Sequence, residues 1–188
     1  MNFIKKNKFI IMLIGAILAM ALIINPIIDA FDTLDVIYRN PDYFSNEAKG
    51  AAIATIASYI CIGLSALFFI LMSYKKSFNR SFMISIIILY FGADIVYIAF
   101  QFINDGNAFS LIYSVIIDVL LIIFMIFSLN NKNYFLTAFT IALIDAAFAL
   151  LGVFNGSQVS FSQFIIDVLL IESIYLYVPD DSEYNYYS

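Results

Sequence analysis

The sequence contains no histidine and no tryptophan, and it has one cysteine among 188 residues. Without histidine, the chain cannot build a histidine metal site, a histidine general base or a histidine proton relay. The single cysteine, Cys61, lies in an apolar run and has no internal partner for a disulfide, so we expect a small buried packing residue. The chain also lacks the glycine patterns that bind nucleotide phosphates. We therefore predict a protein that is not an enzyme and needs no cofactor.

Charged residues are also scarce. They make up 12% of the chain, against 63% hydrophobic residues, and the mean hydropathy is +0.96. Soluble domains carry about a quarter charged residues. This composition predicts one integral membrane domain over residues 1–188, with the lipid bilayer as its main partner and no role in binding nucleic acid.

Six stretches are long and apolar enough to approach the ~20 residues that a bilayer span needs. The first follows three lysines, as a signal peptide would, but it is too long for a cleavable segment and continues into Asn25-Pro26. We therefore expect a retained helix there, and an all-α bundle of six transmembrane helices built of helical hairpins. The expected helices cover residues 9–28, 51–73, 81–103, 108–128, 134–154 and 161–178.

The basic residues predict one orientation in the membrane. With six spans, Lys5, Lys6, Lys8, Lys75, Lys76, Arg80 and Lys132 all fall on one side, and only Arg39 and Lys49 fall on the other. Loops rich in Lys and Arg normally stay in the cytoplasm. We therefore expect both termini in the cytoplasm and the protein in the cell (plasma) membrane.

The segments outside the spans carry most of the acids. Residues 29–50 form the longest expected extracytoplasmic loop, in which helical spacing of apolar residues and of Asp29, Asp32 and Asp35 predicts an interfacial helix with an acidic outer side. Those aspartates could bind cations, but a solvated surface is the simpler interpretation. Residues 179–188 form an acidic, tyrosine-rich tail that should lie in the cytoplasm.

The second half of the chain contains an apparent duplication. The sequence from Ile116 to Ile122 recurs unchanged from Ile165 to Ile171, and each copy carries an aspartate at its third position. Residues 79–128 and 131–178 also begin alike, with Asn-Arg-Ser-Phe and Asn-Lys-Asn-Tyr. Both copies would enter from the same side, which predicts a parallel internal repeat of two hairpins.

Four aspartates fall near the middle of the last four spans: Asp94, Asp118, Asp145 and Asp167. A charge at the centre of a bilayer costs ~2.5–3.5 kcal/mol on insertion scales. The spans contain no lysine or arginine, so the acids need protonation, hydrogen bonds, water or a bound cation. Intramembrane acids often mark functional sites, but protonated aspartates can also act only as hydrogen bonds between helices.

Helical spacing places polar companions beside three of these acids. Asp94 aligns with Tyr97 and Gln101, Asp118 aligns with Ser114, and Asp167 aligns with Gln163, in each case with most companions toward the expected outer surface. Asp145 lies instead on a stripe of small residues. We expect an outward-open polar cavity between the third, fourth and sixth helices. The candidate ligand-binding residues are Asp94, Asp118, Asp145, Asp167, Gln101, Ser114 and Gln163, and whether they hold a metal is left open.

Two functions fit this pattern. The first is a cation- or proton-linked solute transporter, or the substrate-binding subunit of one; in size and number of helices the chain is similar to substrate subunits of energy-coupling-factor importers, although it matches none of their motifs. The second is an accessory or toxin-immunity membrane protein in which the aspartates only join helices. Small residues at Gly15, Ala19, Gly50 and Ala54 would then pack against a partner or a second copy, with Glu172 at the interface.

Overall fold

A computed structural model describes residues 2–105 and 108–177, and the side chains of residues 7–100, 112 and 114–176. This part of the chain folds into α-helices and one 3-10 turn and contains no strand, which confirms the all-α prediction. The acidic tail over 179–188 and the side chain of Gln101 lie outside the described residues. The elements are α1 Asn2–Arg39, α2 Asn46–Lys75, α3 Arg80–Asp105, α4 Ala108–Ser128, η1 Lys132–Tyr134, α5 Phe135–Phe154 and α6 Gln158–Tyr177.

Within the described residues, five helices are long and apolar enough to cross a membrane: those of α1, α2, α3, α5 and α6. The side chains described in α4 from Ser114 onward form a shorter apolar helix, Ser114–Ser128. Large apolar side chains cover the outside of the molecule, including Ile14, Leu136 and Leu151, which are 62%, 71% and 59% exposed. Hydrocarbon is the solvent in which such a surface is stable, so the protein is embedded in a membrane.

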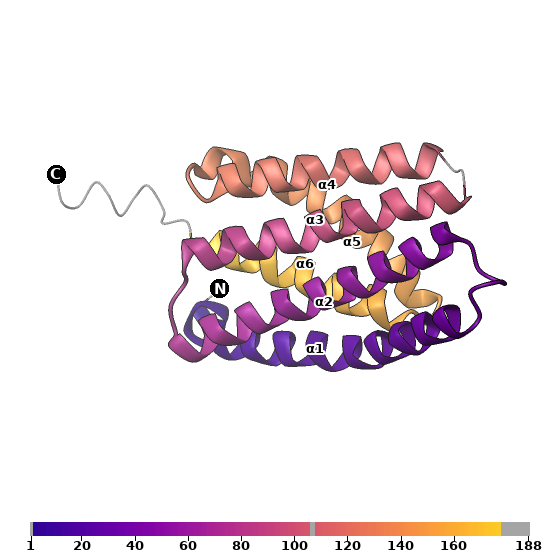
Figure 1. The fold of residues 1–188 in the computed structure, drawn as a ribbon. Helices are drawn as coiled ribbons and strands as arrows, with labels where there is room; N and C mark the ends of the chain where they lie inside the picture. The colour runs from indigo at the N-terminus through magenta and orange to yellow at the C-terminus, as the bar shows by residue number, and fades with distance from the viewer. Residues whose placement is uncertain (1, 106–107, 178–188) are drawn as a thin grey trace.

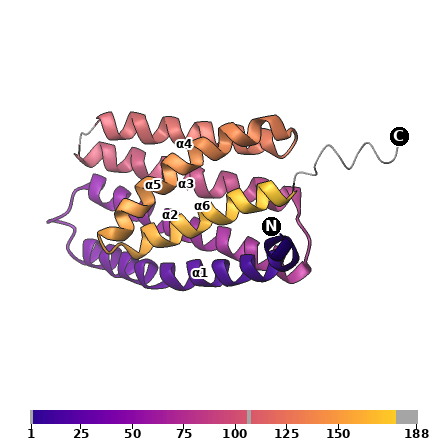
Figure 2. The same cartoon turned by 180° about the vertical axis from the view of Figure 1, so that it is seen from behind.

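The helices form a bundle in which each one packs against the next along the chain, and α6 packs back against α1. Figure 1 shows α1 to α4 side by side, with α5 and α6 behind them. From the opposite side, α5 and α6 cross in front of this layer (Figure 2). The last hairpin therefore covers one face of the layer formed by α1 to α4.

Helix α1 differs from the sequence-based expectation. It continues without interruption past Pro26 to Arg39, so residues 29–39 belong to α1. The prediction of a separate interfacial helix beginning at residue 29 is therefore wrong. A proline inside a helix removes one backbone hydrogen bond, but membrane helices tolerate this loss. With 38 residues α1 is roughly 57 Å long, which exceeds the ~30 Å hydrocarbon core. Its acidic last turns therefore extend beyond the apolar layer.

Short polar side chains fix the helix starts. The Ala48 amide donates to Ser45 Oγ at 3.2 Å, and the Phe82 amide donates to Asn79 Oδ1 at 3.2 Å. Asn131 Oδ1 accepts from the Asn133 amide at 2.9 Å, before η1. Each bond satisfies a backbone N–H that the first helical turn leaves without a partner. Asn79 and Asn131, which open the two apparent repeats, thus have similar capping roles.

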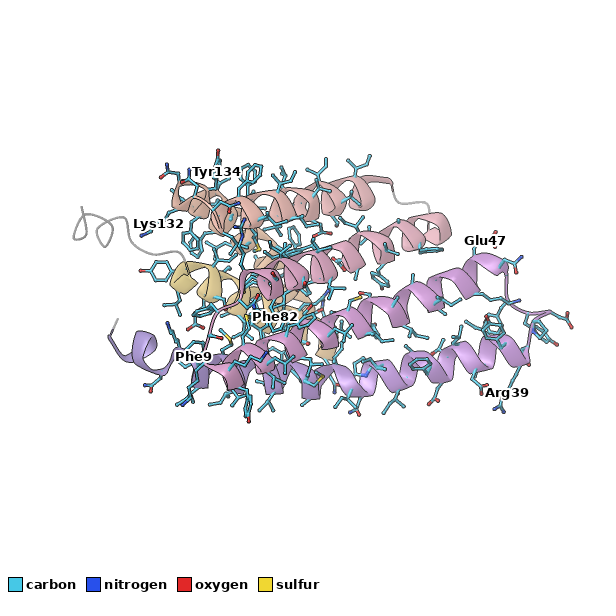
Figure 3. All side chains as sticks on the ribbon, turned by 60° about the vertical axis from the view of Figure 1, so that its left-hand side comes forward. Phe9, Arg39, Glu47, Phe82, Lys132 and Tyr134 are labelled. Carbon is cyan, nitrogen blue, oxygen red and sulfur yellow. The ribbon has the colours of Figure 1, made fainter. Side chains whose placement is uncertain are left out.

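The two ends of the bundle differ in charge. One end carries Lys8, Lys75, Lys76, Arg80 and Lys132, and we call it the basic end. The other end carries Asp29, Asp32, Asp35, Asp42 and Glu47 against Arg39 and Lys49, and we call it the acidic end. Figure 3 shows Arg39 and Glu47 at the acidic end, opposite Phe9, Lys132 and Tyr134. The end of α3, the start of α4 and the α5–α6 connection lie at the acidic end.

Small residues let α1 approach α6 closely. A Cβ added to Gly15 would lie 3.1 Å from Leu169 Cδ2, and Ala16 and Ala19 are completely buried. The Ser162 hydroxyl of α6 donates to the Ala19 carbonyl oxygen of α1 at 2.9 Å. Close contact and an interhelical hydrogen bond are the interactions that hold helices together where no water can drive association.

Candidate functional site

The four intramembrane aspartates line one cavity. Asp94 of α3, Asp118 of α4, Asp145 of α5 and Asp167 of α6 all contribute to a cavity of about 590 Å³. The site is therefore built from two consecutive hairpins, with one carboxyl group from each helix. Cavities of roughly 300–1,000 Å³ are the usual size for sites that bind small molecules.

Helix α5 also lines the cavity, although the sequence predicted a cavity between the third, fourth and sixth helices only. Asp145 was expected on a close-packing stripe of α5, and its stripe does pack: Ala138 and Ala142 are buried. Asp145 itself nevertheless lines the cavity together with Ala149. The carboxyl group lies at the edge of the packed stripe, so α5 forms a fourth wall beside α3, α4 and α6.

The four aspartates differ in solvent exposure. Asp94 and Asp145 are half-buried, whereas Asp118 and Asp167 are 2% and 1% exposed. Oδ2 of Asp118 and both carboxyl oxygens of Asp167 are buried without a hydrogen-bond partner. Buried polar atoms without a partner are uncommon because each costs about 1–3 kcal/mol of desolvation. Two nearly fully buried carboxyl groups thus line the cavity with oxygens that could still accept hydrogen bonds.

Tyr90 is a polar group close to Asp167, the least exposed of the four aspartates. Its hydroxyl donates to the Gln163 carbonyl oxygen at 3.2 Å and joins α3 to α6 across the cavity wall. The same hydroxyl lies close enough to Asp167 to interact with its carboxyl group. A tyrosine hydroxyl has one proton, so donating to Gln163 leaves Asp167 without this donor. A small rotation of the hydroxyl hydrogen would reverse that choice.

The electrostatic environment of the cavity is one-sided. The described residues that line it include four aspartates and neither lysine nor arginine. The four carboxyl groups are near enough to interact electrostatically with one another. When charged, they repel each other in surroundings of low dielectric, where Coulomb energies are larger than in water. A positive ligand or bound protons would relieve this repulsion.

Polar side chains extend the cavity from mid-bundle toward the acidic end. Ser114 and Gln163 line it, as their helical spacing predicts, and Ser160 lies in the first turn of α6. The Ser160 hydroxyl donates to Ser157 Oγ at 3.0 Å. A Cβ on Gly152 would collide with Ser160 Oγ, so glycine is needed where α5 meets this turn. The cavity therefore extends from the aspartates toward the acidic end of the bundle.

Aromatic side chains form much of the remaining wall, and the sequence analysis did not identify most of them. Tyr90, Phe91, Tyr97 and Phe148 line the cavity. Tyr90 and Phe91 meet edge to face, with ring centroids 4.8 Å apart. Helical spacing places two of them on the same helix face as an aspartate, since Tyr90 precedes Asp94 by one turn and Phe148 follows Asp145 by nearly one turn. In a chain this rich in aromatic residues, that spacing alone does not distinguish a cavity wall from lipid contact.

The aspartates near the end of α1 are arranged differently. Asp29, Asp32 and Asp35 are exposed, and the Asp35 carboxylate pairs with Arg39 Nε at 2.8 Å. Asp29 also borders a second, polar cavity of about 650 Å³ between α1, α2 and the α5–α6 turn. No buried, unpartnered side chain lines this cavity among the described residues. This arrangement fits the solvated surface better than a cation site.

The described residues contain no group of three or more acidic or cysteine side chains placed to hold a metal ion together. The cavity that the four aspartates line, about 590 Å³, is larger than a single ion. No protein-family model, curated protein or solved structure matches this chain.

Proposed function

We propose that the protein is a cation- or proton-linked solute transporter, or the substrate-binding subunit of a transporter. The observation that carries this proposal is the shared cavity: four mid-helix aspartates from four helices line it, and the oxygens of Asp118 and Asp167 within it lack partners. Ionisable groups at membrane depth typically face such a cavity when they bind or relay ions. A purely structural acid would be expected to hydrogen-bond a neighbouring helix.

The same proposal includes a topology. We infer six membrane spans, with α4 as the fourth, and a parallel repeat of the α3–α4 and α5–α6 hairpins. Both termini would lie in the cytoplasm, with the basic end inside, and the protein would reside in the plasma membrane. The cavity would then open outward and receive its ligand from outside the cell.

The alternative, a non-transporting accessory or immunity protein, retains one specific observation in its favour. Glu172 Oε1 on α6 is buried without a partner and does not belong to the cavity wall. The small-residue faces offer this alternative less support, because Gly15 packs against Leu169 and a Cβ on Gly50 would meet Phe100. These faces are used within the chain rather than left for a partner.

The test is a thermal-unfolding screen of the detergent-purified full chain against inorganic cations, amines and pH. The variant carries Asp→Asn at all four cavity positions, and Asp32→Asn is the matched control, because Asp32 is exposed and lies outside the cavity. A ligand that binds only the folded state at ~100 times its Kd raises stability by about 2.7 kcal/mol. We expect cations to stabilise the wild type and the Asp32→Asn control but not the cavity variant.

The pH dependence of this effect has a defined sign. A carboxyl group binds a cation only when it has lost its proton, so protons and cations compete for the same oxygens. The stabilisation by a fixed cation concentration should therefore grow as pH rises and shrink as pH falls. If neither cations nor pH distinguish the wild type from the cavity variant, the proposal is rejected, and co-purification of a protein partner becomes the next experiment.

A further inference from the structure

We infer that the preferred ligand of the aspartate cavity is an organic cation, an amine or quaternary ammonium compound with an apolar body, rather than a metal ion. This inference rests on the proposed function and specifies its substrate class. Three features of the cavity lead to it: the separation of its carboxyl groups, its aromatic wall and its size.

The carboxyl groups are too dispersed for a small ion. A calcium ion takes 6–8 oxygen ligands at roughly 2.3–2.6 Å, and a magnesium ion requires still shorter bonds. Such a cage needs several acids converging on one point, and no three acids among the described residues converge in this way. The four aspartates come from four helices and surround about 590 Å³ of space. A larger cation can approach one or two of them while filling the volume between.

The aromatic wall provides the second feature. Tyr90, Phe91, Tyr97 and Phe148 line the same space as the acids. The face of an aromatic ring attracts a cation electrostatically, and quaternary ammonium groups are typically recognised by several rings together. Metal ions and protons have no apolar surface to bury against such a wall, whereas the alkyl groups of an amine gain apolar contact in addition to cation–π attraction.

Charge and size provide the third feature. The described part of the cavity wall contains no basic side chain that would repel a cation or pair with an anion. Asp118 and Asp167 supply buried oxygens without a hydrogen-bond partner. Ser114, Ser160 and Gln163 line the cavity toward the acidic end. An ammonium group would donate to the deep carboxylates, and the apolar body of the ligand would lie against the rings.

Binding to the purified full chain tests this inference directly. The probes are tetraethylammonium and 1,4-diaminobutane, compared with Na⁺, K⁺, Mg²⁺ and Ca²⁺ at matched ionic strength, by thermal shift and titration calorimetry. We expect a concentration-dependent rise in Tm with the organic cations and little change with the metal ions. Asp118→Asn with Asp167→Asn should weaken organic-cation binding by about 30-fold or more, because a buried ligand charge then lacks its partner.

A second pair of variants keeps the test valid if the aspartate variant fails to fold. Phe148→Leu removes a ring from the cavity but keeps an apolar side chain, and should weaken binding by about threefold to tenfold. Phe148→Tyr keeps the ring and should bind nearly as the wild type does. Phe154→Leu is the matched control, since Phe154 is 83% exposed and lies outside the cavity.

The outcomes separate this inference from the proposed function. If metal ions stabilise the wild type and organic cations do not, the organic-cation inference is overturned and a cation-linked function stands. Equal binding of organic cations by the wild type, the aspartate variant and Phe148→Leu also overturns the inference, because binding then occurs elsewhere. If no cation of either class binds and pH has the same effect on wild type and variant, both proposals fail together.

Discussion

Several buried hydroxyl groups make a hydrogen bond within their own helix. Ser65, Ser73 and Ser128 each donate to the carbonyl oxygen four residues earlier, at 2.8, 2.8 and 2.6 Å. This local bond lowers the free-energy cost of burying a serine hydroxyl in an apolar environment. A charged aspartate cannot donate to a carbonyl oxygen of its own helix in this way, because a carboxylate only accepts hydrogen bonds. Among the described residues, Glu172 Oε1 and Ser173 Oγ are also buried without a partner, but only the oxygens of Asp118 and Asp167 belong to side chains that line the cavity.

At this scale, one hydroxyl can be tested for its role between helices. We expect Ser162→Ala to lower the free energy of unfolding by about 0.6 kcal/mol and by no more than about 1.7 kcal/mol, the average and the maximum for hydrogen bonds between membrane helices. The loss arises because Ser162 Oγ donates to Ala19 of another helix and is completely buried. Unfolding of the purified protein by titration with a denaturing detergent measures the change.

The matched control is Ser128→Ala. Ser128 is also completely buried, but its hydroxyl bonds only within its own helix, a bond that survives when the helices separate. We therefore expect a smaller effect than for Ser162→Ala. Equal effects of the two substitutions would show that the α1–α6 hydrogen bond adds nothing to the stability of the bundle.

Among the elements, α1 approaches α6 closely at its small residues, where a Cβ on Gly15 would meet Leu169 and the Ala19 carbonyl accepts from Ser162. Ala16 and Ala19 are completely buried, whereas neighbouring positions such as Ile14 and Ile17 are 62% and 53% exposed. The buried side of α1 combines these small residues with Met12 and Ile23, while other bulky side chains face outward. Bulky apolar side chains are stable on the outside because the lipid is as apolar as the helix surface.

We predict that Ala16→Leu destabilises the bundle by about 1–3 kcal/mol, because a large side chain in a packed interface forces the helices apart. Ala57→Leu makes the same chemical change at an exposed position of α2 and should have little effect on folding. Thermal unfolding of both variants in detergent makes the comparison. An unchanged Tm for Ala16→Leu would mean that the packing of α1 in the bundle does not depend on a small side chain at this buried position.

The Ala57→Leu variant also bears on the accessory hypothesis. If a partner protein packs against the small residues of α2, this variant should fold normally but lose the partner or the cellular function. If function persists while the cavity variants lose it, the exposed small residue Ala57 is not needed for a partner, and the accessory hypothesis loses its support on α2.

For the whole molecule, the distribution of charge between the two ends makes the topology testable. The basic end should face the cytoplasm, because Lys and Arg are retained on that side. Single cysteines can be placed in a Cys61→Ala background at Tyr43 and Asn155 of the acidic end, and at Ser77 and Asn130 of the basic end. All four positions are exposed.

We expect a membrane-impermeant maleimide to label the Tyr43→Cys and Asn155→Cys variants in intact cells, and the Ser77→Cys and Asn130→Cys variants only after lysis. This pattern follows if α2, α3, α4 and α5 each cross the bilayer. Labelling of Ser77→Cys and Tyr43→Cys from the same side would contradict α2 as a span. Labelling of Asn130→Cys in intact cells would contradict the position assigned to α4.

Composition and the lengths of the apolar runs determined the membrane setting and the helical class. Both properties are local, because a helix in lipid satisfies its own backbone whatever its neighbours are. Spacing within a helix also identified the polar companions of Asp118 and Asp167, since Ser114 and Gln163 do line the cavity with them. The polar wall of the cavity could thus be predicted in large part from the sequence.

The tertiary structure decided what spacing within one helix cannot express. Apolar periodicity over residues 27–38 is the same whether α1 continues or a new helix begins after Pro26, so only the folded chain fixes its end at Arg39. The rotation of α5 toward its neighbours, which brings Asp145 and Phe148 into the cavity, is set by how its buried alanines pack. Helix rotation in a membrane depends on neighbouring helices, and for that reason the single-helix pattern left Asp145 on the packing stripe.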